Sequence, residues 1–387
     1  MLGVALALAL LAMLGRTAYL AWTIEVPAPG GRYVEAYVGQ PNALNPLLAA
    51  TDPADREFLP LLFAGLTRVA PDGSVEPDLA EGWEVSPDGR TYTFRLRPGL
   101  RWSDGSALEA DDVAFTFAAL QAPDFPVEAD LLGPWRQVQV ETPDARTVRM
   151  TLPRPWAGLL EAAALGVVPR AALEGSGRDT SSPEARNRSR AEPATAGATA
   201  PAGTRGREWL DHPFNTAPVG AGPYRVADFT VDELVLVPNP WYHGPRPHLA
   251  ELRFRFYPTA QAAAQAVQTG ESAGLALRAS PETAPLRLAP GLAVHEQPDY
   301  ARPVLLWLNT GAPPFDERAV RVAVALAIDR ARLVASLGAA PGTAGQPSAP
   351  LGVPALGPLP PTSWAYAADT PFPQHAPARA AAVLDAA

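Results

Sequence analysis

The chain has 387 residues, which at about 100–200 residues per domain is enough for two or three domains with their own cores. Its 47% hydrophobic and 18% charged residues exclude a largely disordered chain and a coiled coil. A formal net charge of −9 argues against nucleic acid as a partner, and the absence of cysteine excludes disulfides and thiol nucleophiles.

The N-terminus begins with an uninterrupted apolar run, residues 2–14. As a helix this run is about 20 Å long, the size of the apolar core of a signal peptide. Continued through Arg16, Tyr19 and Trp22, it reaches about 36 Å, enough to cross a hydrocarbon core of about 30 Å. We therefore expect residues 1–26 to be a membrane anchor or a cleaved signal, with a buried helix as the less favoured alternative. Both main interpretations place the rest of the chain outside the cytoplasm, in the periplasm or at the cell surface.

The first half of the chain predicts strands, hairpins and one helix. Residues 32–38 are predicted to form a strand, and residues 83–96 a hairpin around the turn Ser-Pro-Asp-Gly. A short helix over 111–120, with acidic residues at its start, is followed by a second hairpin over 138–152 around Pro-Asp. Residues 175–207 carry almost no large apolar side chains, so we expect a disordered insertion there.

After the insertion the chain again alternates strands and helices. A hairpin over 224–237 and a strand over 252–256 precede a helix over 259–269 that ends at Gly270.

The C-terminal region predicts a different set of elements. The apolar run 304–308 predicts a strand buried on both faces, and 315–337 the best helix of the chain. A last helix over 376–387 has no evident partner. Hairpins mixed with helices indicate an α+β or mixed α/β fold.

Motifs for catalysis are largely missing. Gly-Ala-Gly at 220–222 is followed by Pro rather than a helix, a lysine-based phosphate loop is impossible without lysine, and a Gly-x-Ser-x-Gly elbow is absent. His243 and His248 flank a Gly-Pro loop and make only a weak metal pair. Asp104 fits a turn, and residues 111–112 fit a helix start, better than acid–base chemistry. We therefore expect no enzyme, no catalytic residue, no metal site and no cofactor.

Several motifs in a fixed order do identify the chain. The longest block, residues 76–105, starts with Glu-Pro-Asp-Leu-Ala-Glu-Gly-Trp-Glu and ends with Arg-Pro-Gly-Leu-Arg-Trp-Ser-Asp-Gly. The shorter motifs are Asn-Pro-Leu-Leu at 45–48, Val-Gly-Ala-Gly-Pro-Tyr at 219–224, Asn-Pro at 239–240, Thr-Gly-Glu at 269–271, Pro-Phe-Asp-Glu-Arg-Ala-Val-Arg at 314–321 and Ala-Ile-Asp-Arg at 327–330. Together they resemble the family 5 extracellular solute-binding proteins, the peptide/nickel-type receptors of ABC importers.

This resemblance implies a two-lobed α/β fold of the type II periplasmic-binding-protein kind, with an extra α+β domain. It assigns residues 31–58 and 211–298 to the first lobe, 59–210 to the extra domain and 299–387 to the second lobe. The family continues well past this point, so the second lobe is expected to be incomplete.

The function that the resemblance implies is that of a monomeric, extracytoplasmic substrate-binding protein. Such a protein captures a peptide or a similar polar solute by hinge closure and delivers it to the permease of an ABC importer. The alternative is a membrane-tethered sensor that does not transport, or a degenerate or truncated copy of such a receptor. A hydrolase that uses the carboxylates is the least supported interpretation.

The resemblance also implies ligand-binding residues on three segments: the loop after the first strand, the strand that enters the second lobe, and a loop of the extra domain. For Asn45 the alternative is a turn-shaping role, and for Trp307 a place in the core. In chain order the predicted ligand-binding residues are Asn42, Leu44, Asn45, Phe125, Leu306, Trp307 and Asn309.

Overall fold

The computed structural model has a mixed α/β architecture. The residues described are 29–48, 53–122, 125–126, 133–174, 209–277, 304–337 and 373–386, with Met13, Ala293, His295 and scattered positions over 353–369. Apart from Met13, the predicted N-terminal anchor lies outside these residues, as does the predicted disordered insertion. None of the helices in the described ranges combines the length and hydropathy needed to cross a bilayer.

Strands and helices alternate along the described chain. The strands are β1 (Arg32–Val38), β2 (Thr67–Val69), β3 (Val75–Pro77), β4 (Ala80–Val85), β5 (Thr91–Leu96), β6 (Gln139–Asp144), β7 (Thr147–Thr151), β8 (Tyr224–Phe229), β9 (Glu233–Pro238), β10 (Glu251–Tyr257) and β11 (Gly274–Leu275). The helices are α2 (Pro53–Leu62), α3 (Ala110–Gln121), α5 (Leu159–Ala162), α6 (Arg170–Glu174), α9 (Ala260–Gln268), α10 (Arg318–Ala327), α11 (Arg330–Leu337) and α12 (Pro377–Asp385), with short 3-10 turns at Gly133–Gln137 and Pro213–Asn215.

The larger sheet has five strands in the order β11-β1-β10-β9-β8. β1 runs parallel to β10, from Arg32 opposite Glu251 to Val38 opposite Tyr257, and β8, β9 and β10 form an antiparallel meander. The predicted first strand, the hairpin over 224–237 and the strand over 252–256 are therefore confirmed. The helix over 259–269 is also confirmed, since Thr259 caps α9 and Gly270 ends it with a φ of +77°.

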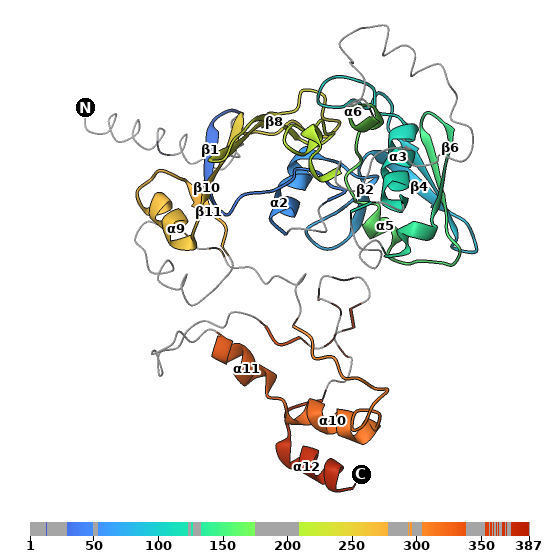
Figure 1. Ribbon diagram of the computed structural model, residues 1–387, viewed down its shortest axis with the longest axis vertical. Coiled ribbons are helices and arrows are strands. Elements are labelled where there is room, and N and C mark those ends of the chain that lie inside the picture. The colour runs from blue at the N-terminus through green and yellow to red at the C-terminus, as the bar shows by residue number, and fades with distance from the viewer. Residues whose placement is uncertain are drawn as a thin grey trace.

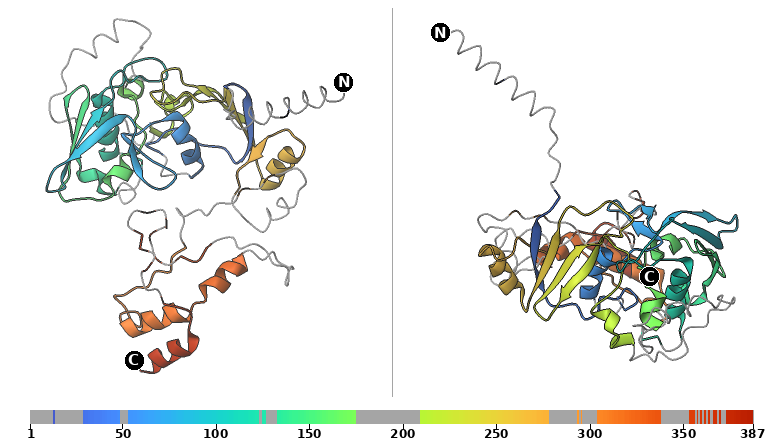
Figure 2. Two further views of the ribbon diagram at one scale, coloured as in Figure 1. Left: turned by 180° about the vertical axis from the view of Figure 1, so that it is seen from behind. Right: turned by 90° about the horizontal axis from the view of Figure 1, so that it is seen from above.

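The second sheet has four antiparallel strands in the order β4-β5-β7-β6. In β5 the residues Tyr92, Phe94 and Leu96 are buried, which is the alternation that the sequence predicts. Both predicted hairpins are confirmed, although β6 extends through Asp144 and places its turn two residues later than expected. The predicted helix over 111–120 is α3. Figures 1 and 2 show the two sheets side by side in one body, with α10, α11 and α12 gathered apart from it.

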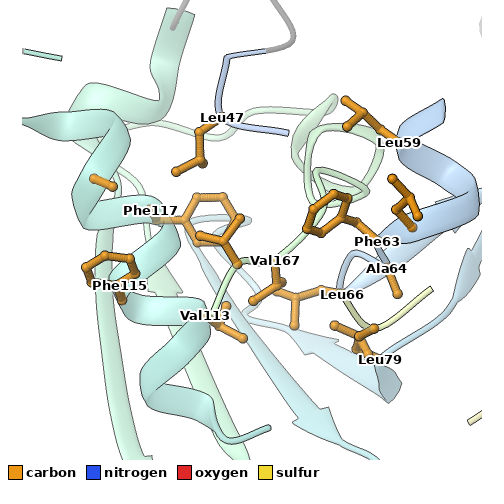
Figure 3. Close-up of a cluster of buried hydrophobic side chains, with 14 of the residues drawn as sticks. Leu47, Leu59, Phe63, Ala64, Leu66, Leu79, Val113, Phe115, Phe117 and Val167 are labelled. Carbon is orange, nitrogen blue, oxygen red and sulfur yellow. The ribbon is translucent and has the colours of Figure 1, made fainter. Parts of the chain in front are cut away.

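One hydrophobic core runs through both sheets (Figure 3). Figure 3 shows Phe63 and Leu66, which follow α2, in the same cluster as Phe117 of α3. Within α2, Phe58 packs edge-on against Phe254 of the larger sheet, with ring centroids 5.0 Å apart. Burial of each such side chain contributes about 1.5–3 kcal/mol, so the residues of α2 and its C-terminal end help to join the two sheets.

The motif Gly-Ala-Gly at 220–222 passes directly over the end of α2. The backbone N–H of Gly222 donates to the carbonyl of Leu62 (2.9 Å), and that of Ser103 to the carbonyl of Gly220 (2.9 Å). A Cβ on Gly222 would lie 2.5 Å from the carbonyl carbon of Leu62, and a Cβ on Gly220 would overlap the Leu62 oxygen. These glycines therefore serve close backbone packing rather than phosphate binding.

The C-terminal helices differ from the prediction of one helix over 315–337, which is wrong. The chain forms α10 and α11 instead, because Ile328 adopts an extended conformation with a ψ of 116°. The side chain of Asp329 then accepts a hydrogen bond from the backbone N–H of Arg332 (2.9 Å), as an N-cap does.

The expectation that the last helix lacks a partner is also wrong. Ala380 of α12 is buried against Ala323 and Leu326 of α10. The backbone N–H of Ala376 donates to the carbonyl of Leu326 (2.8 Å) at the start of α12. Small alanine side chains allow this close helix contact, which a scan for large apolar residues overlooks.

The prediction of a buried strand over 304–308 is wrong as well. No strand is assigned there, and Val304 and Trp307 are 90% and 84% exposed. An apolar run becomes a buried strand only where neighbouring strands satisfy its backbone and other layers cover it. None of the described strands pairs with this segment.

Candidate functional site

The loop after β1 is held in place by α2. Gly39 turns the chain out of β1 with a φ of +90°. The carboxylate Oδ1 of Asp55, in the first turn of α2, accepts the backbone N–H groups of Asn42 (2.7 Å) and Ala43 (3.2 Å). The buried carboxylate thus orders the loop and satisfies two backbone donors.

Asn45 is fully buried and both ends of its amide are hydrogen-bonded. Its Nδ2 donates to Oδ1 of Asn215 (2.9 Å), and its Oδ1 accepts the backbone N–H of Leu47 (3.0 Å). The predicted neighbour Leu44, also fully buried, donates its backbone N–H to the carbonyl of Asn215 (2.8 Å). Asn45 therefore joins the loop over 39–48 to the segment over 209–216.

Asn215 is a residue that sequence reasoning missed. Its Nδ2 donates to the carbonyls of Trp209 (2.8 Å) and Leu210 (2.9 Å) while its Oδ1 accepts from Asn45. An isolated asparagine after Phe214 belongs to no recognisable pattern, and its partner lies 170 residues away in the sequence. No local signal could have singled it out.

Phe125 lies against the same segment. Its ring meets Trp209 edge-on, with centroids 5.5 Å apart, and both residues are buried. Three of the predicted residues, Leu44, Asn45 and Phe125, are therefore brought together around residues 209–215. The fourth predicted residue of this region, Asn42 on the loop over 39–48, is exposed.

The other predicted residues lie on the segment before α10. Leu306 and Trp307 are exposed, and Oδ1 of Asn309 accepts the backbone N–H of Gly311 (3.1 Å), which shapes a turn. None of the described strands, β1 included, pairs with this segment. The ligand-binding roles of both groups stay predictions.

The carboxylates and histidines weighed for chemistry have structural partners. Asp104 accepts the backbone N–H of Ser106 (2.9 Å) in a turn. Asp112 accepts backbone N–H groups from Glu109 (3.1 Å) and Arg170 (3.0 Å), and burial raises its pKa to about 6. His243 pairs with Asp78 rather than with His248. Within the described part of the chain, no three His, Asp or Glu side chains gather as possible metal ligands.

Comparison with known proteins agrees with the fold and with the order of motifs. The family described as "Bacterial extracellular solute-binding proteins, family 5 Middle" matches residues 74–387. A probable di/tripeptide-binding protein 5 of Pseudomonas aeruginosa is 29% identical over 330 residues, which cover 81% of this chain and 56% of that protein. The dipeptide-binding protein of Escherichia coli is 26% identical over 385 residues, covering 94% of this chain and 65% of that protein.

Solved structures share the fold along most of this chain. HbpA2 from Haemophilus parasuis superposes with a TM-score of 0.68 at 21% identity, covering 92% of this chain and 66% of that one. The oligopeptide-binding protein AppA from Bacillus subtilis, solved with a nonapeptide, gives 0.63 at 22% identity, covering 93% and 64%. The chain thus spans between half and two thirds of the length of the two curated relatives. It has the two-lobed α/β fold of the solved structures. It belongs to the bacterial extracellular solute-binding proteins of family 5.

Proposed function

We propose that the protein is an extracytoplasmic solute receptor that delivers its ligand to the permease of an ABC importer. The observation that carries this proposal is the family match over residues 74–387. Proteins of this kind work by closing two lobes on the ligand, so affinity for the closed form drives the motion. Such binding requires no covalent chemistry.

A peptide or a similar polar solute is the ligand class that the relatives favour. Two relatives carry di- or tripeptide-binding names, and AppA was solved with a nonapeptide. Other members bear different names, including heme-binding protein A of Haemophilus influenzae and NikZ of Campylobacter jejuni solved with Ni(L-His). A peptide's backbone amides need hydrogen-bond partners in a cleft, which extended protein segments can supply.

The predicted site residues divide into two roles under this proposal. Asn42, Leu306 and Trp307 are exposed, as is Asn309, and we assign the ligand contacts to these residues. Leu44, Asn45 and Phe125 are buried and act by positioning the loop and the segment over 209–216.

The proposed lobes follow the two sheets. The joining of β1 to β8, β9, β10 and β11 supports a first lobe built from residues 31–58 and 211–298. The four-stranded sheet, which lies within residues 80–151, supports an extra domain over 59–210. Residues 299–387 would then belong to the second lobe.

We further propose that the protein is a monomer and that residues 1–26 attach it to the membrane. Expression of the full chain followed by membrane fractionation and N-terminal sequencing tests the second point. A membrane-bound chain that starts at its first residues supports an anchor, and a soluble chain that starts after residue 26 contradicts it.

Calorimetric titration of the full chain tests the receptor function. Di- to pentapeptides should give saturable binding, while a nickel–histidine complex and oligosaccharides serve as the competing ligand classes. Trp307→Ala should weaken peptide binding at least tenfold, about 1.4 kcal/mol. The control Val231→Ala, at an exposed position of the turn between β8 and β9, should leave it unchanged. A titration that shows no binding heat with any of these ligand classes would refute the proposal.

A further inference from the structure

The loop that follows β9, residues 239–245, borders two adjoining cavities. The larger, of about 450 Å³, lies between this loop and the residues that follow β5. The smaller, of about 280 Å³, lies between the same loop and the end of β3. Arg97, Tyr242 and His243 line both cavities, so the two form one hollow.

Hydrogen bonds and close packing hold the loop over 239–245 in one conformation. The side chain of Asn239 donates through Nδ2 to the carbonyl of Gly222 (2.9 Å) and accepts the backbone N–H of Trp241 (2.9 Å) through Oδ1. Beyond it, a Cβ on Gly244 would lie 2.6 Å from the ring of Tyr242, so only glycine lets that ring lie across the backbone. The aromatic side chains are thus presented by a loop tied to the core.

The acidic groups that line the hollow already have side-chain partners. Nε2 of His243 lies 2.8 Å from Oδ1 of Asp78, and each side chain is only 12% exposed. Glu81 faces Arg95 (3.2 Å) and Arg146 (3.4 Å). Each acid that lines the hollow is therefore already engaged by a neighbouring side chain.

Arg97 differs from these pairs. Its Nε donates to the backbone carbonyl of Asp78 (2.6 Å), which fixes the plane of the guanidinium. Its two terminal nitrogens have no acceptor among the described residues, whereas Arg68, the other arginine of the hollow, binds Glu76 (2.7 Å). A guanidinium held at one nitrogen and open at two is the geometry that binds an oxyanion in a bidentate manner.

Tyr242 adds a neutral donor beside this cation. Burial, followed by the charge of Asp78, raises the pKa of its hydroxyl, while Arg68 and Arg97 oppose the rise. Tyr242 lines both cavities together with Arg97, and the raised pKa keeps its hydroxyl protonated at neutral pH. It can therefore donate a hydrogen bond to an anion on Arg97.

Trp241 supplies a flat apolar surface to the larger cavity. Its side chain is 47% exposed, yet the guanidinium of Arg101 lies 5.0 Å from the ring centroid. Nη1 of Arg101 donates to the carbonyl of Gly105 (2.7 Å), and a Cβ on Gly105 would lie 3.1 Å from Nε1 of the indole. The ring is thus held in place while much of it faces solvent.

We propose that this hollow binds a small organic anion, a carboxylate or a phosphate monoester that carries a flat apolar group. The oxyanion binds the terminal nitrogens of Arg97 and the hydroxyl of Tyr242, and the flat group stacks on Trp241. A volume of about 450 Å³ is within the range of about 300–1,000 Å³ usual for small-molecule sites. The site is separate from the proposed peptide site, because it shares none of the residues assigned to it.

Calorimetry on the full chain with three matched probes tests the proposal. Benzoate and phenyl phosphate carry the two forms of oxyanion, and benzamide is the neutral match of benzoate. We expect one or both anions to bind at millimolar or lower concentrations and benzamide to bind at least tenfold more weakly. Whichever anion binds more tightly identifies the oxyanion that the hollow prefers.

Two variants and one control locate the binding. Arg97→Gln should weaken anion binding at least tenfold, while Arg90→Gln, on the exposed turn before β5, should leave it unchanged. Trp241→Ala, at a half-exposed position, should weaken benzoate binding at least threefold and leave inorganic phosphate binding unchanged, which also shows that the variant is folded. The proposal is overturned if neither anion binds up to about 10 mM, if benzamide matches benzoate, or if both variants bind as the wild type does.

Discussion

Replacing Gly222 by alanine tests the close packing between the larger sheet and the end of α2. The added Cβ would lie 2.5 Å from the carbonyl carbon of Leu62, 2.6 Å from the backbone nitrogen of Phe63 and 2.8 Å from the carbonyl oxygen of Leu61. Ordinary carbon contacts are about 3.5–4.0 Å, so the backbone must move by about 1 Å. None of these atoms belongs to a flexible side chain that could turn away.

The cost follows from this overlap and from the hydrogen bonds at the same place. Overpacking of this kind costs about 1–3 kcal/mol. The shift also strains the bond from Gly222 to the carbonyl of Leu62 and that from Asn239 to the carbonyl of Gly222, each worth about 1 kcal/mol. We expect Gly222→Ala to lower the free energy of unfolding by about 2–4 kcal/mol, a large share of a typical 5–15 kcal/mol.

Urea unfolding of the full chain, followed by circular dichroism, measures this loss. The matched control is Gly82→Ala in β4, where an added Cβ meets nothing within 4 Å and the backbone φ is not positive. The control should change the free energy of unfolding by less than about 0.5 kcal/mol. Equal stability of the two variants would refute the packing argument.

Three further predictions follow from buried polar groups and from an exposed indole. Asn45→Ala removes the donor to the buried Oδ1 of Asn215 and the acceptor of the Leu47 N–H, and it should lower the free energy of unfolding by about 1–3 kcal/mol in the same urea assay. A loss under about 0.5 kcal/mol would contradict this. Burial raises the pKa of Asp112 to about 6 in the folded chain, above about 3.9 when unfolded, so its contribution to stability is greatest below pH 4 and is lost as the pH rises through 6. The stability of the wild type relative to Asp112→Asn should therefore fall by about 2–3 kcal/mol from pH 4 to 7, and a flat difference would count against the burial argument. Trp307, 84% exposed, should change its emission when a peptide binds, measured as the difference spectrum against Trp307→Phe, and identical responses of the two proteins would remove it from the site.

Elements that depend on neighbouring residues alone were predictable from the sequence. The alternation of polar and apolar residues in β5, the turn chemistry between β4 and β5, and the Thr259 and Gly270 ends of α9 are all local signals. The Asp-capped break at Ile328–Asp329 was a local signal too, but the apolar periodicity that continues across it concealed the break.

Features that depend on distant partners were not predictable. The segment over 304–308 has the composition of a buried strand but is exposed, because burial requires neighbours that no local pattern specifies. The helix α12 was expected to stand alone and instead packs on α10 through alanines.

In the two candidate sites, too, the sequence indicated single residues but not their distant partners. The sequence marked Asn45 through the motif Asn-Pro, yet only the fold revealed its partner Asn215, 170 residues away. Likewise His243 was weighed against His248, five residues along the chain, whereas the fold pairs it with Asp78 at a separation of 165 residues.

The sequence by itself determined the family, the β and α character of most segments, and the glycines that allow the chain to turn. Only the tertiary structure decided that Gly222 carries a packing contact, that Asn45 joins two segments and that Arg97 opens onto a hollow. The physical reason is that backbone preferences and side-chain periodicity act between near neighbours. Hydrogen bonds, ion pairs and cavities instead depend on which distant segments the packed core brings together.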